Sequence, residues 1–176
     1  MSLEAAVVIG VGALAVVLWW WRSRSNLHRA RLPPELRGAC LVYAEQLFRS
    51  VGPVSITARV DRVYRNATDA LVLVELKTRT ANLTYQSDVI ELSAQRFALM
   101  AQTGKFVSDH AFVLTERPDG RRTGCHQVKL MLHGEVVALA MRHRDLLIGK
   151  AAPETACSPG LCRKCVFVRP CGPFER

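Results

Sequence analysis

The sequence predicts a mixed α/β domain in which helices flank a central sheet. Two observations predict strands, since apolar and polar residues alternate over residues 54–61 and residues 71–77 are almost continuously apolar. A third observation predicts a helix that Ser87 or Asp88 caps and that Gly104 ends. With the elements described next, the order is helix, strand, strand, helix, strand, strand, helix, which is typical of a sheet covered by helices.

Shorter patterns predict the remaining elements. Apolar side chains recur at helical spacing over residues 35–50, which predicts an amphipathic helix that Gly52-Pro53 ends. Two strands are expected at residues 111–114 and 127–132, and a last helix at residues 135–149. We therefore expect one folded domain over residues 35–150, followed by a tail over residues 151–176 that holds four of the six cysteines.

The N-terminal region predicts a membrane anchor. Residues 5–21 carry no charge, and at ~1.5 Å per residue such a helix is ~26 Å long, which nearly spans a bilayer core. Three tryptophans end this run, and the basic linker at residues 22–34 follows it, which places the main domain in the cytoplasm. The alternative, a secretory signal peptide, needs a basic region before the run and a small-residue cleavage site, and neither is present.

The charge balance favours anionic partners. The chain has 24 Lys and Arg residues against 15 Asp and Glu residues, which gives a net charge of +9. A balance of this size suits nucleic acid or an anionic membrane surface, and charge alone does not choose between them. The sequence does not indicate an oligomeric state.

Two carboxylates are expected to face each other across a hairpin. If the strands on either side of residues 66–69 pair so that Val63 lies near Leu73, then Asp61 lies opposite Glu75 with Cβ atoms ~5 Å apart. Two carboxylates at that distance repel unless a cation lies between them. Mg²⁺ suits such a pair, because it takes one or two carboxylates and completes its shell with water and phosphate.

Lys77 is expected on the same face as Glu75, two residues further along the strand. Its ammonium group can orient a metal-bound water or help to deprotonate it. The alternative is a buried Glu–Lys ion pair without a metal, since Glu75 and Lys77 interrupt the most apolar strand of the chain.

These residues resemble a known family. Val60-Asp61-Arg62-Val63, then Val74-Glu75-Leu76-Lys77-Thr78, then a helix with Gln95 resemble the PD-(D/E)XK nuclease superfamily, especially its RecB-like branch and the CRISPR-associated exonucleases. The resemblance covers residues 35–171 and implies a restriction-endonuclease-like fold. It implies that Asp61, Glu75 and the backbone carbonyl of Leu76 hold Mg²⁺ or Mn²⁺, that Lys77 is catalytic and that Gln95 supports the site.

The chain departs from this family at two positions. The family helix often carries a tyrosine four residues after the glutamine, and this chain has Leu99 there. Many members place a histidine or an acid on the first helix, and Glu45 is the acid available in the helix expected at residues 35–50.

The cysteine-rich tail predicts a second metal site. Cys162 and Cys165 have the spacing of a two-ligand clip for zinc or an iron–sulfur cluster, and Cys171 is a third ligand. The fourth ligand is Cys157 in the tail or Cys40 on the first predicted helix, with a slight preference for Cys157 because the tail set is then complete. The family resemblance implies a [4Fe–4S] cluster, and Zn²⁺ is the alternative. Cys125 is interpreted as a small packed residue.

Basic side chains lie on or near the predicted hairpins. They could contact phosphates, or they could form an ordinary basic surface near an anionic membrane, and the two interpretations are nearly even. These residues are Arg59, Arg62, Arg65, Arg79, Arg121 and Arg122. The expected function is a membrane-anchored, Mg²⁺- or Mn²⁺-dependent deoxyribonuclease, and the resemblance suggests exonuclease action on single-stranded DNA ends. The alternative is a catalytically weak or inactive module of the same fold that binds DNA or a protein at the membrane.

Overall fold

The structure is a computed structural model that describes residues 32–52, 54–154 and 160. The predicted anchor and most of the basic linker lie outside the described residues, as do the four tail cysteines, Cys157, Cys162, Cys165 and Cys171. Within the part that is described, no helix is both long and apolar enough to cross a bilayer. The chain divides into two compact units, one ending at Leu132 and the other beginning at His133.

The first unit contains a five-stranded mixed sheet, which confirms the predicted α/β class. Its strands lie in the order β1-β2-β3-β4-β5, and every neighbouring pair is antiparallel except β3 and β4. The bounds are β1 (Cys40–Arg49), β2 (Thr57–Arg65), β3 (Leu71–Thr78), β4 (His110–Glu116) and β5 (Arg122–Lys129). Helix α2 (Gln86–Thr103) forms the crossover that parallel strands need between β3 and β4.

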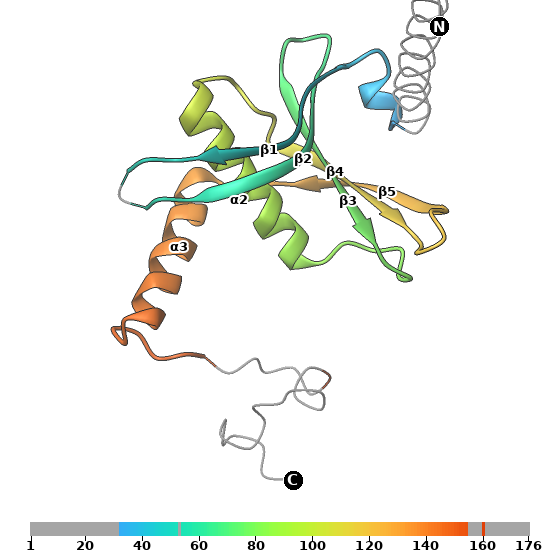
Figure 1. Ribbon diagram of the computed structural model, residues 1–176. Helices are drawn as coiled ribbons and strands as arrows, with labels where there is room; N and C mark the ends of the chain where they lie inside the picture. The colour runs from blue at the N-terminus through green and yellow to red at the C-terminus, as the bar shows by residue number, and fades with distance from the viewer. Residues whose placement is uncertain (1–31, 53, 155–159, 161–176) are drawn as a thin grey trace, which may run out of the picture. The chain divides into compact units, whose positions relative to one another are not determined.

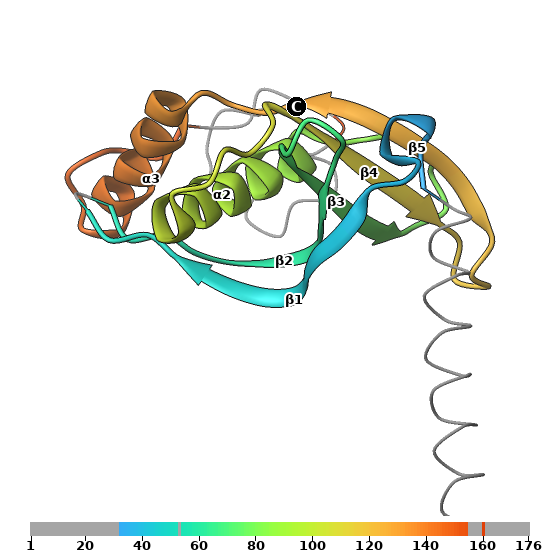
Figure 2. The same ribbon diagram turned by 90° about the horizontal axis from the view of Figure 1, so that it is seen from above.

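The first half of strand β3, Leu71–Val74, is apolar because both faces of the sheet are covered there. On one face, Leu71 and Leu73 pack in a core with Leu92 and Leu99 of α2, and α2 lies along β1, β2 and β3 (Figures 1 and 2). On the other face, Val72 and Val74 join a second core that includes Leu36 of the short 3₁₀ helix η1 (Pro34–Leu36). Each fully buried side chain of this size contributes about 1.5–3 kcal/mol.

The helix predicted over residues 35–50 is wrong, because most of this segment is strand β1. Its backbone hydrogen bonds go to β2, so pairing with a neighbouring strand overrides the local helical spacing. The register shifts between Leu41 and Tyr43, and Glu45 has a positive φ of 51°. These irregularities remove the regular alternation by which a strand is read from sequence.

The other predicted elements are confirmed, with shifted ends. Helix α2 begins two residues before Asp88, whose side chain accepts a hydrogen bond from the Tyr85 N–H, and Gly104 ends it at a φ of 67°. A side chain at position 104 would be strained at that φ. Strand β5 begins at Arg122, well before the strand predicted at residues 127–132. In the second unit, α3 (His133–Leu147) matches the last predicted helix.

Candidate active site at the fork between β2 and β3

Strands β2 and β3 separate where the candidate site lies. Their pairing runs from Arg65 and Leu71 through Val63 and Leu73, which confirms the predicted register. In the described strands, this pairing ends one step before Asp61 and Glu75. Beyond that point β2 continues beside β1, and β3 continues beside β4, so that a fork opens between them (Figure 1).

The Asp61 side chain lies in this fork. Its Oδ2 atom accepts a hydrogen bond from the Leu76 N–H at 2.9 Å, in place of a backbone partner on β2. In a β-strand, the N–H and C=O groups of one residue point to the same neighbouring strand. The Leu76 carbonyl therefore faces the Asp61 side of β3, where the family resemblance requires it.

Glu75 is a buried carboxylate with two partners. Glu75 is only 3% exposed to solvent. Gln95 donates a hydrogen bond from Nε2 to Oε2 at 2.9 Å, and the Lys77 ammonium lies 2.8 Å from Oε1. Burial raises the pKa of Glu75 above its ordinary value, the hydrogen bonds from Lys77 and Gln95 oppose that rise, and the charge of Asp61 adds to it.

Lys77 bridges two carboxylates. Its Nζ atom contacts Glu75 and also Glu91 of α2, the latter at 2.7 Å. Burial lowers the pKa of Lys77, but the hydrogen bonds and charges of Glu75 and Glu91 outweigh burial and raise that pKa overall. Lys77 is thus a cation at neutral pH. The buried Glu–Lys pair, considered from the sequence as the alternative to a metal site, is present in this arrangement.

Three polar contacts fasten α2 to β3 beside the fork. Alternate residues of β3 and the loop after it, Glu75, Lys77 and Arg79, contact Gln95, Glu91 and Asp88 respectively. The strand residues are two apart, and the helix residues are four and three apart, so each set lies on one face of its element. Sequence reasoning missed Glu91 and Asp88, although their spacing from Gln95 was a signal that they share its face.

The donor set at the fork fits a sparsely liganded divalent ion. Asp61, Glu75 and the Leu76 carbonyl offer hard oxygen atoms, which Mg²⁺ and Mn²⁺ prefer. Among the described residues, no group of three or more His, Cys, Asp or Glu side chains is placed to hold a metal ion. If an ion were held by two carboxylates and one carbonyl, water would have to complete its shell.

Several residues lie where the sequence did not place them. Glu45 is an exposed residue of β1, and its neighbours' register puts it opposite Asp61, so the prediction of a first-helix acid is wrong. Cys40 is the exposed first residue of β1. Cys125 is exposed, which contradicts its interpretation as a packed residue. Leu99 is fully buried in the core beneath α2.

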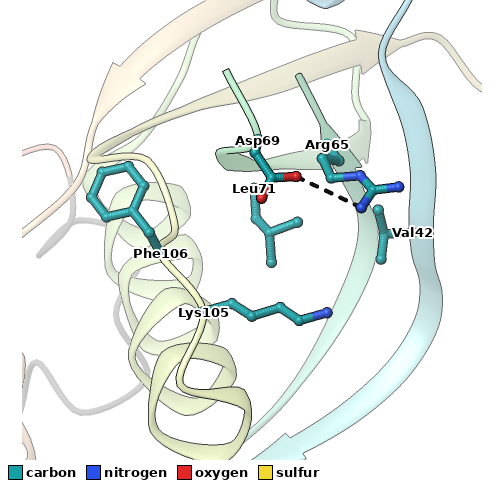
Figure 3. Close-up of a pocket in the computed structure, with 6 residues that line it drawn as sticks. All are labelled: Val42, Arg65, Asp69, Leu71, Lys105 and Phe106. Carbon is teal, nitrogen blue, oxygen red and sulfur yellow. Dashed lines mark ion pairs between the residues drawn. The ribbon is translucent and has the colours of Figure 1, made fainter. Parts of the chain in front are cut away.

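The arginines near the hairpins differ in how they are held. Arg79 is tied to Asp88 at 2.6 Å, whereas Arg65 makes a longer contact of 3.7 Å with Asp69 at the surface. Arg65, Lys105 and Leu71 line a pocket of about 210 Å³ (Figure 3). Leu71 and Glu75 are four positions apart on β3, or ~13 Å, so this pocket is distinct from the fork.

No family model and no curated protein matches the chain. Among solved structures, the crystal structure of SSO0001 is similar at 12% identity and a TM-score of 0.46, and the match covers 98% of this chain and 75% of that one. Similarity at this level assigns neither the fold nor the function, which rest on the residues of this chain.

Proposed function

We propose that the protein is a membrane-anchored, divalent-metal-dependent deoxyribonuclease that hydrolyses DNA phosphodiesters. The observation that supports this most is the placement of Asp61, Glu75 and Lys77 at one open fork, next to the apolar first half of β3. The resemblance to the PD-(D/E)XK superfamily supports exonuclease-like action on single-stranded ends. The order of strands, with β1 to β3 antiparallel and α2 leading to a parallel β4, is the basis for proposing a restriction-endonuclease-like fold.

In this proposal Asp61, Glu75 and the Leu76 carbonyl hold Mg²⁺ or Mn²⁺. When bound, such an ion would lower the pKa of the attacking water and offset negative charge on the phosphate. Gln95 fixes the orientation of the Glu75 carboxylate through its hydrogen bond. Lys77 remains protonated, so it acts as a positive charge beside the phosphate and orients the water rather than removing its proton.

The rest of the chain is proposed to hold and position this domain. Residues 5–21 anchor it, with the catalytic domain in the cytoplasm. Cys157, Cys162, Cys165 and Cys171 bind a [4Fe–4S] cluster, with Zn²⁺ as the alternative metal and Cys40 as the alternative fourth ligand. Visible absorption of anaerobically prepared protein, together with metal analysis, separates these: colourless protein with one zinc per chain would exclude the cluster.

A second candidate is a catalytically inactive module that binds DNA or a protein at the membrane. The observation that favours it is that both Glu75 oxygens already have partners, Lys77 and Gln95. Under this candidate the pair is a structural ion pair, and binding is independent of divalent ions.

A cleavage assay separates the two candidates. The full chain in detergent is incubated with end-labelled single- and double-stranded DNA in Mg²⁺, Mn²⁺ or EDTA. Asp61→Asn, Glu75→Gln and Lys77→Met are each expected to lower the rate by about 10²–10³-fold. Asp69→Asn removes the same charge from the turn of the same hairpin and is expected to cleave normally. Equal cleavage by wild type and Glu75→Gln excludes catalysis at the fork.

A further inference from the structure

The loop between β3 and α2, which follows the strand that carries Glu75 and Lys77, holds an exposed aromatic ring. We propose that Tyr85, supported from behind by Arg79, is a stacking platform for a base of single-stranded DNA. This inference rests on the proposed function, since it assumes that nucleic acid reaches the fork. It adds a binding site for a base that flanks the bond to be cut.

One side of the ring is covered and much of the rest is open. The guanidinium carbon of Arg79 lies 4.8 Å from the Tyr85 ring centroid, within the range of a cation–π contact. Tyr85 is nevertheless 47% exposed. A large aromatic surface left in solvent beside a nuclease-type fork is suited to a planar partner, because every base presents a π-face.

The platform is held rigidly before any ligand arrives. Asp88 accepts hydrogen bonds from the Arg79 guanidinium at 2.6 Å and from the Tyr85 N–H at 2.8 Å, so a single carboxylate holds the Arg79 side chain and the Tyr85 backbone. The Arg79 N–H donates to the Glu116 carbonyl at 2.8 Å, which fixes the start of the loop. A ring held in this way loses little conformational freedom when a base stacks on it.

The position of the ring follows from the contacts between β3 and α2. Glu75, Lys77 and Arg79 meet Gln95, Glu91 and Asp88 in order, so that the chain passes from the fork towards the start of α2. Glu75 and Arg79 are four positions apart, which is ~13 Å along an extended chain. The ring therefore lies too far from the fork for the nucleotide being cut, and it suits a flanking one.

The chemistry favours a single strand over a duplex. Bases in a duplex are already stacked and paired, whereas unpaired bases are free to stack on an aromatic ring. The charge of Arg79 is paired with Asp88, so the cation strengthens and orients the ring without serving as a phosphate contact. The platform is expected to accept all four bases with little sequence preference.

The test is a double-mutant cycle that combines removal of the Tyr85 ring with removal of one DNA base. Anisotropy of a labelled single-stranded oligonucleotide is measured with the full chain in detergent and EDTA, while one abasic site is moved along the strand. For wild type, one position is expected to weaken binding by about 5- to 150-fold when its base is removed. Tyr85→Ala should weaken binding of the intact strand by the same factor and remove the effect of that abasic position. Tyr85→Phe keeps the ring and should behave as wild type.

Phe106→Ala is the matched control. Phe106 is another exposed ring, at 65%, and it follows Gly104 at the opposite end of α2. This variant should keep the abasic-site effect. The inference is overturned if Tyr85→Ala retains that effect, if no abasic position matters, or if wild type does not bind single strands. If DNA binds through Tyr85 but is not cleaved in Mg²⁺ or Mn²⁺, the proposed nuclease activity is overturned and the stacking site is not. If DNA is cleaved but the effect of the abasic site does not depend on Tyr85, only the stacking site is overturned.

Discussion

Gln95 donates a hydrogen bond from Nε2 to Oε2 of Glu75 at 2.9 Å, and both residues are buried. The two lie 20 positions apart, with Gln95 on α2 and Glu75 on β3. Gln95→Met keeps the size of the side chain and removes the donor. It should lower the free energy of unfolding by about 1–3 kcal/mol, because a buried carboxylate oxygen loses its partner.

Thermal or urea unfolding of the full chain in detergent checks the Gln95 prediction. Gln102→Met on the same helix is the control, since Gln102 accepts an exposed hydrogen bond from the Arg49 N–H. A loss no larger for Gln95→Met than for Gln102→Met would contradict the role given to this contact.

Glu75→Gln is expected to stabilise the fold at neutral pH in EDTA. Burial raises the folded-state pKa of Glu75, so folding disfavours its charged form, and stability is lost as pH rises through that pKa. The glutamine carries no charge to bury. The gain in melting temperature should be largest at neutral pH and should shrink in acid, where wild-type Glu75 is also neutral. A gain that grows as pH falls would contradict the sign.

Lys77→Met should destabilise the fold, because it leaves the Glu75 carboxylate without its cation. Lys77 is 25% exposed, and we expect a loss of about 1–3 kcal/mol. The double variant with Glu75→Gln should recover most of that loss, since no buried charge then lacks a partner. Unfolding of the two single variants and the double variant measures the coupling, and additive effects would mean that the pair does not interact.

Gly124→Ala should destabilise the loop between β3 and α2, which contains Asn82. A Cβ atom at position 124 would overlap the Asn82 side chain and the His126 ring. Asn82 Oδ1 accepts a hydrogen bond from the Thr115 hydroxyl at 2.9 Å, so its displacement breaks the link between this loop and β4. We expect a loss of about 1–3 kcal/mol in unfolding measurements.

The control for this substitution is Gly134→Ala. Gly134 lies in the first turn of α3, where an added Cβ meets open space, so alanine should be neutral or stabilise by up to about 1 kcal/mol. Equal effects of the two substitutions would show that the contact between Gly124 and Asn82 does not matter.

Part of this structure was predictable from local patterns. The apolar run at β3 and the glycine that ends α2 are strong signals, because each depends on few residues and one physical cause. The register of Val63 with Leu73 followed from the length of the turn, and it places Asp61 next to Glu75 in the fork.

The rest depends on tertiary packing. Residues of β1 carry helical spacing, and only their pairing with β2 makes them a strand. Glu91 and Asp88 contact Lys77 and Arg79 because α2 lies across β3 at one particular rotation, which no local pattern specifies. The fork itself arises where two strands part, so the sequence could indicate the two acids but not the space between them.

The proposed nuclease activity depends on a divalent ion that Asp61 and Glu75 share. Mn²⁺ binding to the full chain in detergent, followed by the electron paramagnetic resonance signal of the free ion, tests it most directly. Wild type and Asp69→Asn should bind Mn²⁺ alike, and Asp61→Asn and Glu75→Gln should each bind at least about tenfold more weakly. Equal Mn²⁺ affinity in all four proteins would contradict the account, because the ion would then bind elsewhere or not at all.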